Sequence, residues 1–340
     1  MTGDNVLIEY ITFRNFNLTE DGGAILWNGN NGILQNCNFI NNTGNWGGAV
    51  CWNATNGTII SSTFTDNTAN INGGGVEWCG SATNGSIIDS TFIGNNATNY
   101  YGGGVHWTGA NGIICNSTFV GNNANREGGA VWWNGPKSKI FNSIFTQNKA
   151  INGNGGAIFV GGLNGEILSS TFTNNTANGN AGGVDWWGDN GTIIDSTFIN
   201  NTGLNGNGGG LVWGNPNGIV SDCSFIGNKA GAGAGIRWSG INGSLIDSTF
   251  IDNIATMYGG AIYWNVAGSM ANCSFVNSKG INSNGIQAQN NLNINGGNGI
   301  VYVYIVGTLS GISIVVLNNV TYYYPPNSNI NLPNNKQRIP

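Results

Sequence analysis

The sequence predicts an all-β protein folded as a single-stranded, right-handed parallel β-helix of about eleven coils. A doublet of Gly or other small residues recurs every 25 to 29 residues, starting at positions 22, 47, 73, 102, 128, 155, 181, 208, 233 and 259. Most repeats also carry an Asn-Gly turn with Phe seven residues after its Gly, as from Gly191 to Phe198. Short runs with the period of two of β-strands lie between these signals, so each repeat is expected to form three strands and three bends of one solenoid coil.

The strand after the doublet places two residues of each coil in the core. Stacked coils turn every repeat position into a column whose members lie roughly 4.8 Å apart. The third position after the doublet is always aliphatic, and the fifth, on the same side of the strand, is Trp in all but one coil. We therefore interpret the Trp column as core, with its indole N–H groups bonded near the strand ends, and not as a sugar-stacking platform. The column comprises Trp27, Trp52, Trp78, Trp107, Trp133, Trp186, Trp213, Trp238 and Trp264, with Val160 as the exception.

The two strands after the Asn-Gly turn supply the other core columns. An aliphatic residue follows the turn, and a small residue and the Phe come after the next corner. Cys37, Cys223 and Cys273 alternate with Ser in the small column, so we interpret them as fillers. An Asn three residues after the Phe, as at Asn201, predicts a structural asparagine ladder.

Cys51 and Cys79 lie in adjacent coils but two positions out of register, which favours free thiols and leaves a disulfide as the alternative. The six cysteines have no zinc-site spacing. The net charge of -5 and the absence of a basic run argue against nucleic acid as a partner.

Domain boundaries follow from where the repeat fades. Residues 1–297 are expected to form the β-helix, 298–324 a short β-rich segment, and 325–340 a linker or truncated tail. The uncharged stretch Gly299–Leu317 is long enough for a membrane helix, but its Val, Ile and Tyr content and its internal Gly residues favour two strands. No signal peptide or anchor is recognisable, so we expect a fragment of a larger surface protein that begins inside the solenoid.

The signals GGAI or GGAV and FxxN resemble the repeat of bacterial polymorphic outer-membrane proteins. Together with NNTA, NGTI and the VYVYI and TYYYPP segments, the chain over residues 5 to 324 looks like the adhesin-like surface proteins of methanogenic archaea. The resemblance implies a right-handed parallel β-helix and an extracellular or cell-surface location. It carries over no functional residues.

The position between the aliphatic residue and the Trp points outward, and its residues do not repeat. We expect this column to be the solvent face: Leu26, Cys51, Glu77, His106, Trp132, Phe159, Asp185, Val212, Arg237 and Tyr263. Glu77 and His106 are expected to form an exposed ion pair, with an acid–base dyad as the alternative. Glu77 and Asp185 are four coils apart, roughly 19 Å, too far for a glycosidase pair. The binding candidates are Trp46, Glu77, Tyr100, Tyr101, His106, Trp132, Phe159, Asp185, Trp187, Arg237, Tyr258 and Tyr263.

Asp195, Asp222 and Asp247 stand at the same corner of three successive coils. We interpret them as corner caps, so no cofactor is expected, with calcium as the alternative. Thirteen Asn-x-Ser/Thr sequons occur, among them Asn17, Asn53, Asn56, Asn84, Asn190, Asn242 and Asn319. Those at Asn-Gly turns are expected to be exposed enough for glycosylation in an exported chain.

These observations predict a non-enzymatic adhesin-like protein that binds a surface glycan, or a protein of another cell, through the outward face and the variable bends. The alternatives are a polysaccharide lyase or glycoside hydrolase on the same fold, and a structural stalk.

Overall fold

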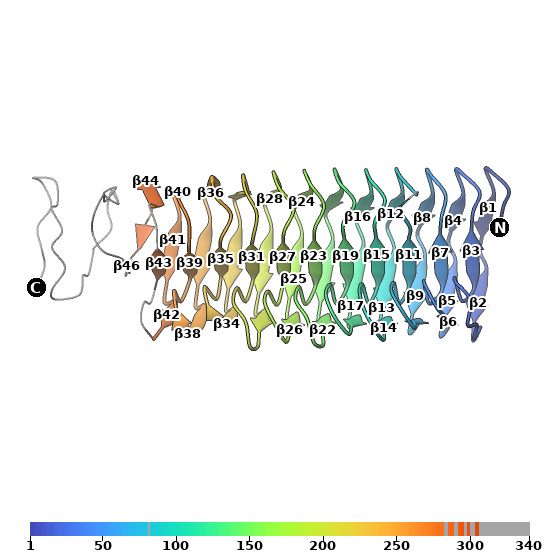
Figure 1. Cartoon of the computed structure of the whole chain (residues 1–340), viewed down its shortest axis with the longest axis horizontal. Helices are drawn as coiled ribbons and strands as arrows, with labels where there is room; N and C mark the ends of the chain where they lie inside the picture. The colour runs from blue at the N-terminus through green and yellow to red at the C-terminus, as the bar shows by residue number, and fades with distance from the viewer. Residues whose placement is uncertain (81, 282–284, 289–291, 296–297, 300–302, 306–340) are drawn as a thin grey trace, which may run out of the picture.

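The computed structural model describes residues 1–80, 82–281, 285–288, 292–295, 298–299 and 303–305. The chain coils into a right-handed solenoid whose turns stack along one axis, with the N-terminus at one end (Figure 1). All paired strands run parallel, and the described residues contain no helix. The predicted parallel β-helix is confirmed.

The strands form four parallel sheets, which we name sheets A to D in chain order. Among the described residues, sheets A, B and D have twelve strands each and sheet C has ten. Sheet A follows the Asn-Gly turn and consists of β1 (Leu7–Glu9), β4 (Ile33–Gln35), β8 (Thr58–Ile60), β12 (Ser86–Ile88), β16 (Ile113–Cys115), β20 (Lys139–Phe141), β24 (Glu166–Leu168), β28 (Thr192–Ile194), β32 (Ile219–Ser221), β36 (Gly243–Ile246), β40 (Gly268–Ala271) and β44 (Leu292–Asn295).

Sheet B carries the Phe column and consists of β2 (Thr12–Arg14), β5 (Asn38–Ile40), β9 (Thr63–Thr65), β13 (Thr91–Ile93), β17 (Thr118–Val120), β21 (Ile144–Thr146), β25 (Thr171–Thr173), β29 (Thr197–Ile199), β33 (Ser224–Ile226), β37 (Thr249–Ile251), β41 (Ser274–Val276) and β45 (Asn298–Gly299).

Sheet C follows the asparagine ladder and consists of β6 (Thr43–Gly44), β10 (Thr68–Ala69), β14 (Asn96–Ala97), β18 (Asn123–Ala124), β22 (Lys149–Ala150), β26 (Thr176–Ala177), β30 (Thr202–Gly203), β34 (Lys229–Ala232), β38 (Ile254–Tyr258) and β42 (Lys279–Gly280). The expectation of three strands per coil was wrong here. The two residues after each ladder Asn pair with the next coil, but most of these strands are too short to show a period of two.

Sheet D carries the Trp column and consists of β3 (Ile25–Trp27), β7 (Val50–Trp52), β11 (Val76–Trp78), β15 (Val105–Trp107), β19 (Val131–Trp133), β23 (Ile158–Val160), β27 (Val184–Trp186), β31 (Leu211–Trp213), β35 (Ile236–Trp238), β39 (Ile262–Trp264), β43 (Ile286–Ala288) and β46 (Val303–Ile305). The register aligns equivalent template positions, so that Glu77 lies opposite His106 and Trp78 opposite Trp107.

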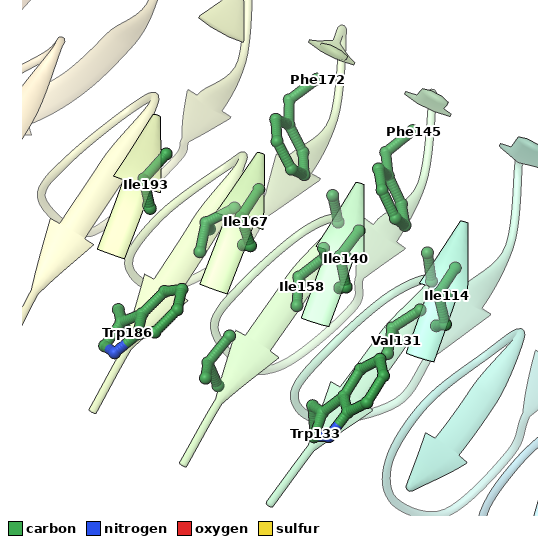
Figure 2. Close-up of a cluster of buried hydrophobic side chains, with 14 of the residues drawn as sticks. Ile114, Val131, Trp133, Ile140, Phe145, Ile158, Ile167, Phe172, Trp186 and Ile193 are labelled. Atoms are coloured by element: carbon green, nitrogen blue, oxygen red, sulfur yellow. The ribbon is translucent and has the colours of Figure 1, made fainter. Parts of the chain in front are cut away.

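The core is a set of stacked side-chain columns, as predicted. Successive indoles of the Trp column stack with ring centroids 4.3 to 5.3 Å apart. Figure 2 shows Trp133 and Trp186 on the same side of the core as Val131 and Ile158, with Ile140 and Ile167 beside them and Phe145 and Phe172 at the far side. Between those two indoles Val160 leaves a small cavity with room for about one water.

The predicted indole N–H bonds form in part of the Trp column. Five indoles donate to backbone carbonyls a few residues along the chain: Trp27, Trp78, Trp186, Trp213 and Trp238. The Nε1 atoms of Trp52, Trp107, Trp133 and Trp264 have no hydrogen-bond partner among the described residues.

The Trp column explains sterically why Asn-Gly turns recur in this protein. Asn190 has a left-handed φ of 56°, which Asn tolerates better than most residues. A Cβ on the following Gly191 would lie 2.3 Å from the Trp186 ring, so only Gly leaves room for the indole. Where adjacent turns both carry Asn, the amide of one donates to the other, as from Asn190 Nδ2 to Asn164 Oδ1 at 3.1 Å, and Lys137 interrupts this row. This exposed amide row, the outer ladder, includes the sequon residues Asn56, Asn84, Asn190 and Asn242.

The predicted asparagine ladder is confirmed and lies inside the solenoid. Asn148 is buried and donates through Nδ2 to Phe119 O and Asn175 Oδ1, each at 3.0 Å. Its Oδ1 accepts from the backbone N and the Nδ2 of Asn122, each at 3.0 Å. This inner ladder pairs the polar groups of a bend that water does not reach.

The strands β45 and β46 pair with β41 and β43 and so extend sheets B and D beyond residue 297. Most of the predicted 298–324 segment and all of the predicted tail at 325–340 lie outside the described residues. No helix long and apolar enough to cross a membrane occurs among the residues that the structure describes.

Candidate functional site

The outward residues of sheet D, which we name the outer column, are less exposed than predicted. Cys51, Glu77, His106, Asp185 and Val212 are all buried, so the expectation of a solvent face is wrong for these five residues. We name the segment between sheet C and each Gly doublet the cover bend. At His106 the rings of Trp46 and Tyr101, from two cover bends, pack against the outward side of sheet D, whereas strand parity fixes only which side of the sheet a residue faces.

The pair of Glu77 and His106 forms, but as a buried contact. His106 Nδ1 and Glu77 Oε1 are 2.9 Å apart, and the two side chains are 6% and 2% exposed. The expectation of an exposed ion pair is therefore wrong. The other carboxylate oxygen, Glu77 Oε2, is buried without a hydrogen-bond partner among the described residues. Burial makes the loss of either partner costly, because the remaining group would stay buried without its hydrogen bond.

Aromatic rings from neighbouring coils enclose His106. Trp132 stacks on the imidazole with ring centroids 4.5 Å apart, and Tyr101 stacks on Trp132 at 5.2 Å. Trp46 approaches His106 edge-on at 6.5 Å from a cover bend earlier in the chain. The rings of Tyr101, His106 and Trp132 stack on one another, so the faces that meet in this stack are occupied by protein. The enclosed imidazole is held in a fixed orientation beside the carboxylate.

Cys51 and Cys79 lie at the edge of this cluster. Their Sγ atoms are 4.0 Å apart and both thiols are free, in agreement with the favoured interpretation. The hydrogen bond with Cys79, together with burial, raises the pKa of the Cys51 thiol. Cys51 therefore stays protonated and is a poor nucleophile at neutral pH.

Tyr100 and Phe159 flank the cluster on either side. Tyr100 is exposed at its cover bend, and the Arg126 guanidinium lies 5.0 Å from its ring centroid. Phe159 is half-buried and stacks on Trp132 at 6.0 Å. The structure thus brings seven of the twelve predicted binding residues into one group: Trp46, Glu77, Tyr100, Tyr101, His106, Trp132 and Phe159.

A second group surrounds Asp185, two strands beyond Trp132 in the outer column. Asp185 is completely buried, and its Oδ1 accepts a 3.0 Å hydrogen bond from Trp187 Nε1. Its Oδ2 has no partner among the described residues. Burial raises the pKa of this carboxyl to about 8, against the opposing effect of the Trp187 bond. Trp187 itself is 41% exposed.

The remaining candidates lie towards the C-terminal end of sheet D. Arg237 is half-buried, and its Nε atom has no partner among the described residues. Tyr263, on the next strand of the same column, stacks with the exposed Tyr258 at 6.1 Å. Asp185 and Arg237 are separated in the column by Val212.

The register keeps the two buried carboxyls of the outer column apart. From Glu77 the column passes His106, Trp132 and Phe159 before it reaches Asp185, four strand spacings or roughly 19 Å away. That separation exceeds the range of glycosidase carboxyl pairs.

The corner aspartates have the geometry of turn residues. Asp195, Asp222 and Asp247 have left-handed φ values of 51°, 54° and 47°, and Asn116 takes the same conformation at the equivalent corner. This favours the interpretation as caps. Among the described residues, no group of three or more His, Cys, Asp or Glu side chains is arranged to hold a metal ion.

Sequence reasoning missed the surroundings of Trp187. Gly161 and Gly214 occupy the equivalent positions in the two neighbouring coils. The backbone N–H of each of the three residues donates to the equivalent carbonyl of the preceding coil, which identifies the shared position. Asp189 follows Trp187 by two residues, Asn215 follows Gly214 directly, and the Asn215 amide donates to the Asp189 carboxylate at 2.7 Å. The signal was available, since a single Trp between two Gly residues stands in a column that is otherwise Asn, Thr, Ser or Cys.

Two comparisons with known proteins agree with this architecture. The model of the Chlamydia polymorphic membrane protein repeat matches residues 142–161 and 247–263. The solved complex of alginate lyase AlyF-OU02 with G6 has a TM-score of 0.59 and 11% sequence identity, covering 87% of this chain and 80% of that chain. At this identity the likeness shows the parallel β-helix fold alone. No curated protein sequence matches the chain.

Proposed function

We propose that the chain is a non-enzymatic, adhesin-like protein of the cell surface that binds a glycan or a protein of another cell through the side of sheet D. The observation that carries the proposal is the exposure of large aromatic residues on this side. Tyr100, Trp187 and Tyr258 are each 36% to 41% exposed, in a solenoid that buries its whole Trp column. Aromatic side chains on rigid strands are well suited to binding.

Two further observations support the proposal. The outer column and the cover bends differ from coil to coil, whereas the core columns repeat, so specificity is expected to reside in the variable positions. The matched repeat belongs to a family whose name describes membrane proteins, which supports a location at the cell surface.

The test is a binding screen of the purified chain against a glycan array and against whole cells, with and without the exposed aromatics. Wild-type protein is expected to bind, and a Tyr100→Ala, Trp187→Ala, Tyr258→Ala triple variant is expected to bind much less. Because Trp187→Ala also removes the hydrogen bond to the buried Asp185, circular dichroism must show that the triple variant is folded under the binding conditions. Equal binding by the triple variant would contradict this choice of surface. A wild-type chain that binds nothing would favour the structural stalk.

The buried pair of Glu77 and His106 favours an enzyme as the second candidate. A carboxylate bonded to one imidazole nitrogen orients the ring, which is the arrangement used in general acid–base catalysis. Lyase and hydrolase assays on uronic-acid and neutral polysaccharides test this candidate. Turnover that is lost in Glu77→Gln and His106→Gln variants would support an enzyme, and absence of turnover on every polymer would leave the adhesin-like function.

A further inference from the structure

Trp187 occupies a position that other coils fill with a small polar residue or Gly. Its backbone N–H donates to Val160 O, and the equivalent bond defines the same position in neighbouring coils. Read along the chain, this position is Asn28, Asn53, Cys79, Thr108, Asn134, Gly161, Trp187, Gly214, Ser239 and Asn265. The only indole in the column is therefore flanked on both sides by residues without side chains.

The indole lies flat against Gly214. A Cβ on Gly214 would be 2.7 Å from Trp187 Cε3, 2.8 Å from Cδ2 and 3.0 Å from Cζ3. Three bonded ring atoms at such similar distances place that point over the face of the ring, because an approach to the ring edge would leave the outer two clearly farther away. Gly214 is thus the seat of one indole face. The 41% exposure of Trp187 leaves a large part of the ring open to solvent.

A buried hydrogen bond fixes the orientation of the ring. Trp187 Nε1 donates to Asp185 Oδ1 at 3.0 Å, and Asp185 is completely buried. The exposed aromatic surface is therefore held in place before any ligand arrives, which lowers the entropic cost of binding. This fixed ring differs from Trp132, whose faces stack against His106 and Phe159.

Two hydrogen-bonding side chains come from residues near the indole and its seat in the chain. Asp189 follows Trp187 by two residues, and Asn215 follows the seat residue Gly214. Both side chains are half-buried, and Asn215 Nδ2 donates to Asp189 Oδ1 at 2.7 Å. A flat apolar surface beside a carboxylate and an amide matches the chemistry of a sugar ring, which has an apolar C–H face and hydroxyl groups around its rim.

We propose that Trp187, seated on Gly214 and flanked by Asp189 and Asn215, is a binding subsite for a neutral pyranose unit of a polysaccharide. The C–H face of the sugar stacks on the open part of the indole, and its hydroxyls bond to the Asp189 carboxylate and the Asn215 amide. The carboxylate beside the ring disfavours uronic acids through like-charge repulsion. This inference rests on the proposed function, because it assigns the sugar class and the place of glycan binding.

Isothermal titration with cellohexaose and chitohexaose tests the proposal, with an alginate hexamer as the acidic comparison. Wild type is expected to bind at least one of the neutral hexamers, and Trp187→Asn is expected to weaken that binding about ten-fold or more. Asn is the residue that several coils carry at this position, but Trp187→Asn also removes the indole donor to the buried Asp185, so circular dichroism must show that the variant is folded at the titration temperature. Thr108→Asn, three coils away in the same column, is the matched control and should bind like wild type.

Gly214→Ser provides a second variant that keeps the indole. Its Cβ would collide with the Trp187 ring and displace it, so it should weaken binding even though every candidate binding residue is present. Bound neutral hexamer should also protect the exposed Trp187 from iodide quenching in wild type, and this protection should be absent in Trp187→Asn.

The outcomes separate the two proposals. Neutral-hexamer binding that is unchanged in both Trp187→Asn and Gly214→Ser would overturn the subsite and leave glycan binding by the chain intact. Binding of the alginate hexamer alone would overturn the neutral-sugar assignment. If wild type bound none of these hexamers, the subsite would be overturned, and only a negative result on the wider glycan array and whole-cell screen would overturn the proposed function as well.

Discussion

His106 Nδ1 lies 2.9 Å from Glu77 Oε1, which belongs to the adjacent strand of sheet D, and both side chains are almost fully removed from water. The contact joins two coils on the outside of sheet D, under rings that come from cover bends. A charged group in such a place depends on its partner, because it has lost most of its hydration.

The first prediction concerns this pair. His106→Ala leaves the Glu77 carboxyl buried without its partner and should lower the unfolding free energy by about 3 to 5 kcal/mol. The double variant Glu77→Val, His106→Val should lose much less, because the column already accepts a buried Val212. Urea denaturation monitored by circular dichroism measures both. A double variant that is less stable than His106→Ala would contradict the prediction.

The second prediction is a pH dependence that comes from Asp185. Burial raises the pKa of this carboxyl from 3.8 to about 8, so the folded state holds a proton that the unfolded chain releases. The stability from this group is fully present below about pH 4 and is lost as the pH rises towards and through about 8. Asp185→Asn, which stays neutral, should therefore show a flatter fall of melting temperature between pH 5 and 9. Parallel pH profiles for the two proteins would refute this assignment.

The third prediction compares the two amide ladders. Asn148→Ala removes a buried side chain that bonds to three residues, Phe119, Asn122 and Asn175, and should cost about 3 kcal/mol or more. Asn56→Gly removes one exposed ladder member at a left-handed φ of 55°, where Gly fits, and should cost less than about 1 kcal/mol. Thermal melts of both variants decide whether the inner ladder has the greater weight.

The fourth prediction concerns the corner aspartates. Because Asp195, Asp222 and Asp247 take the left-handed conformation of turn residues, chelation of calcium should leave the melting temperature unchanged. A ligand that binds only the folded state would raise it by mass action. A melting temperature that falls with chelator and recovers with added calcium would instead support the alternative of a calcium site.

The core columns could be predicted from the sequence because their identity repeats. The Trp, Phe and inner-ladder Asn of Trp186, Phe198 and Asn201 recur in nearly every coil, and these columns are buried along most of the solenoid. The distance between Glu77 and Asp185 could also be predicted, because the number of coils between two residues of one column fixes their separation along the solenoid axis.

The burial of the outer column could not be predicted from strand parity. It depends on side chains from the cover bends, such as Trp46, which reaches His106 although sixty residues separate them. Cover bends also vary in length, so the spacing of residues in the sequence does not predict which cover bend packs against the sheet. The position of Trp187 between Gly161 and Gly214 is different, because its signal was a local exception within a regular column.

The two amide ladders point in opposite directions along the solenoid. In the inner ladder each Nδ2 donates towards the C-terminal end, as from Asn148 to Asn175, whereas in the outer ladder Asn190 donates towards the N-terminal end, to Asn164. Their aligned amide dipoles therefore oppose one another, unlike the peptide dipoles of an α-helix, which add up to charged ends. The two rows therefore contribute to the dipole along the solenoid axis with opposite signs, and a further coil that carries both amides adds to both contributions at once.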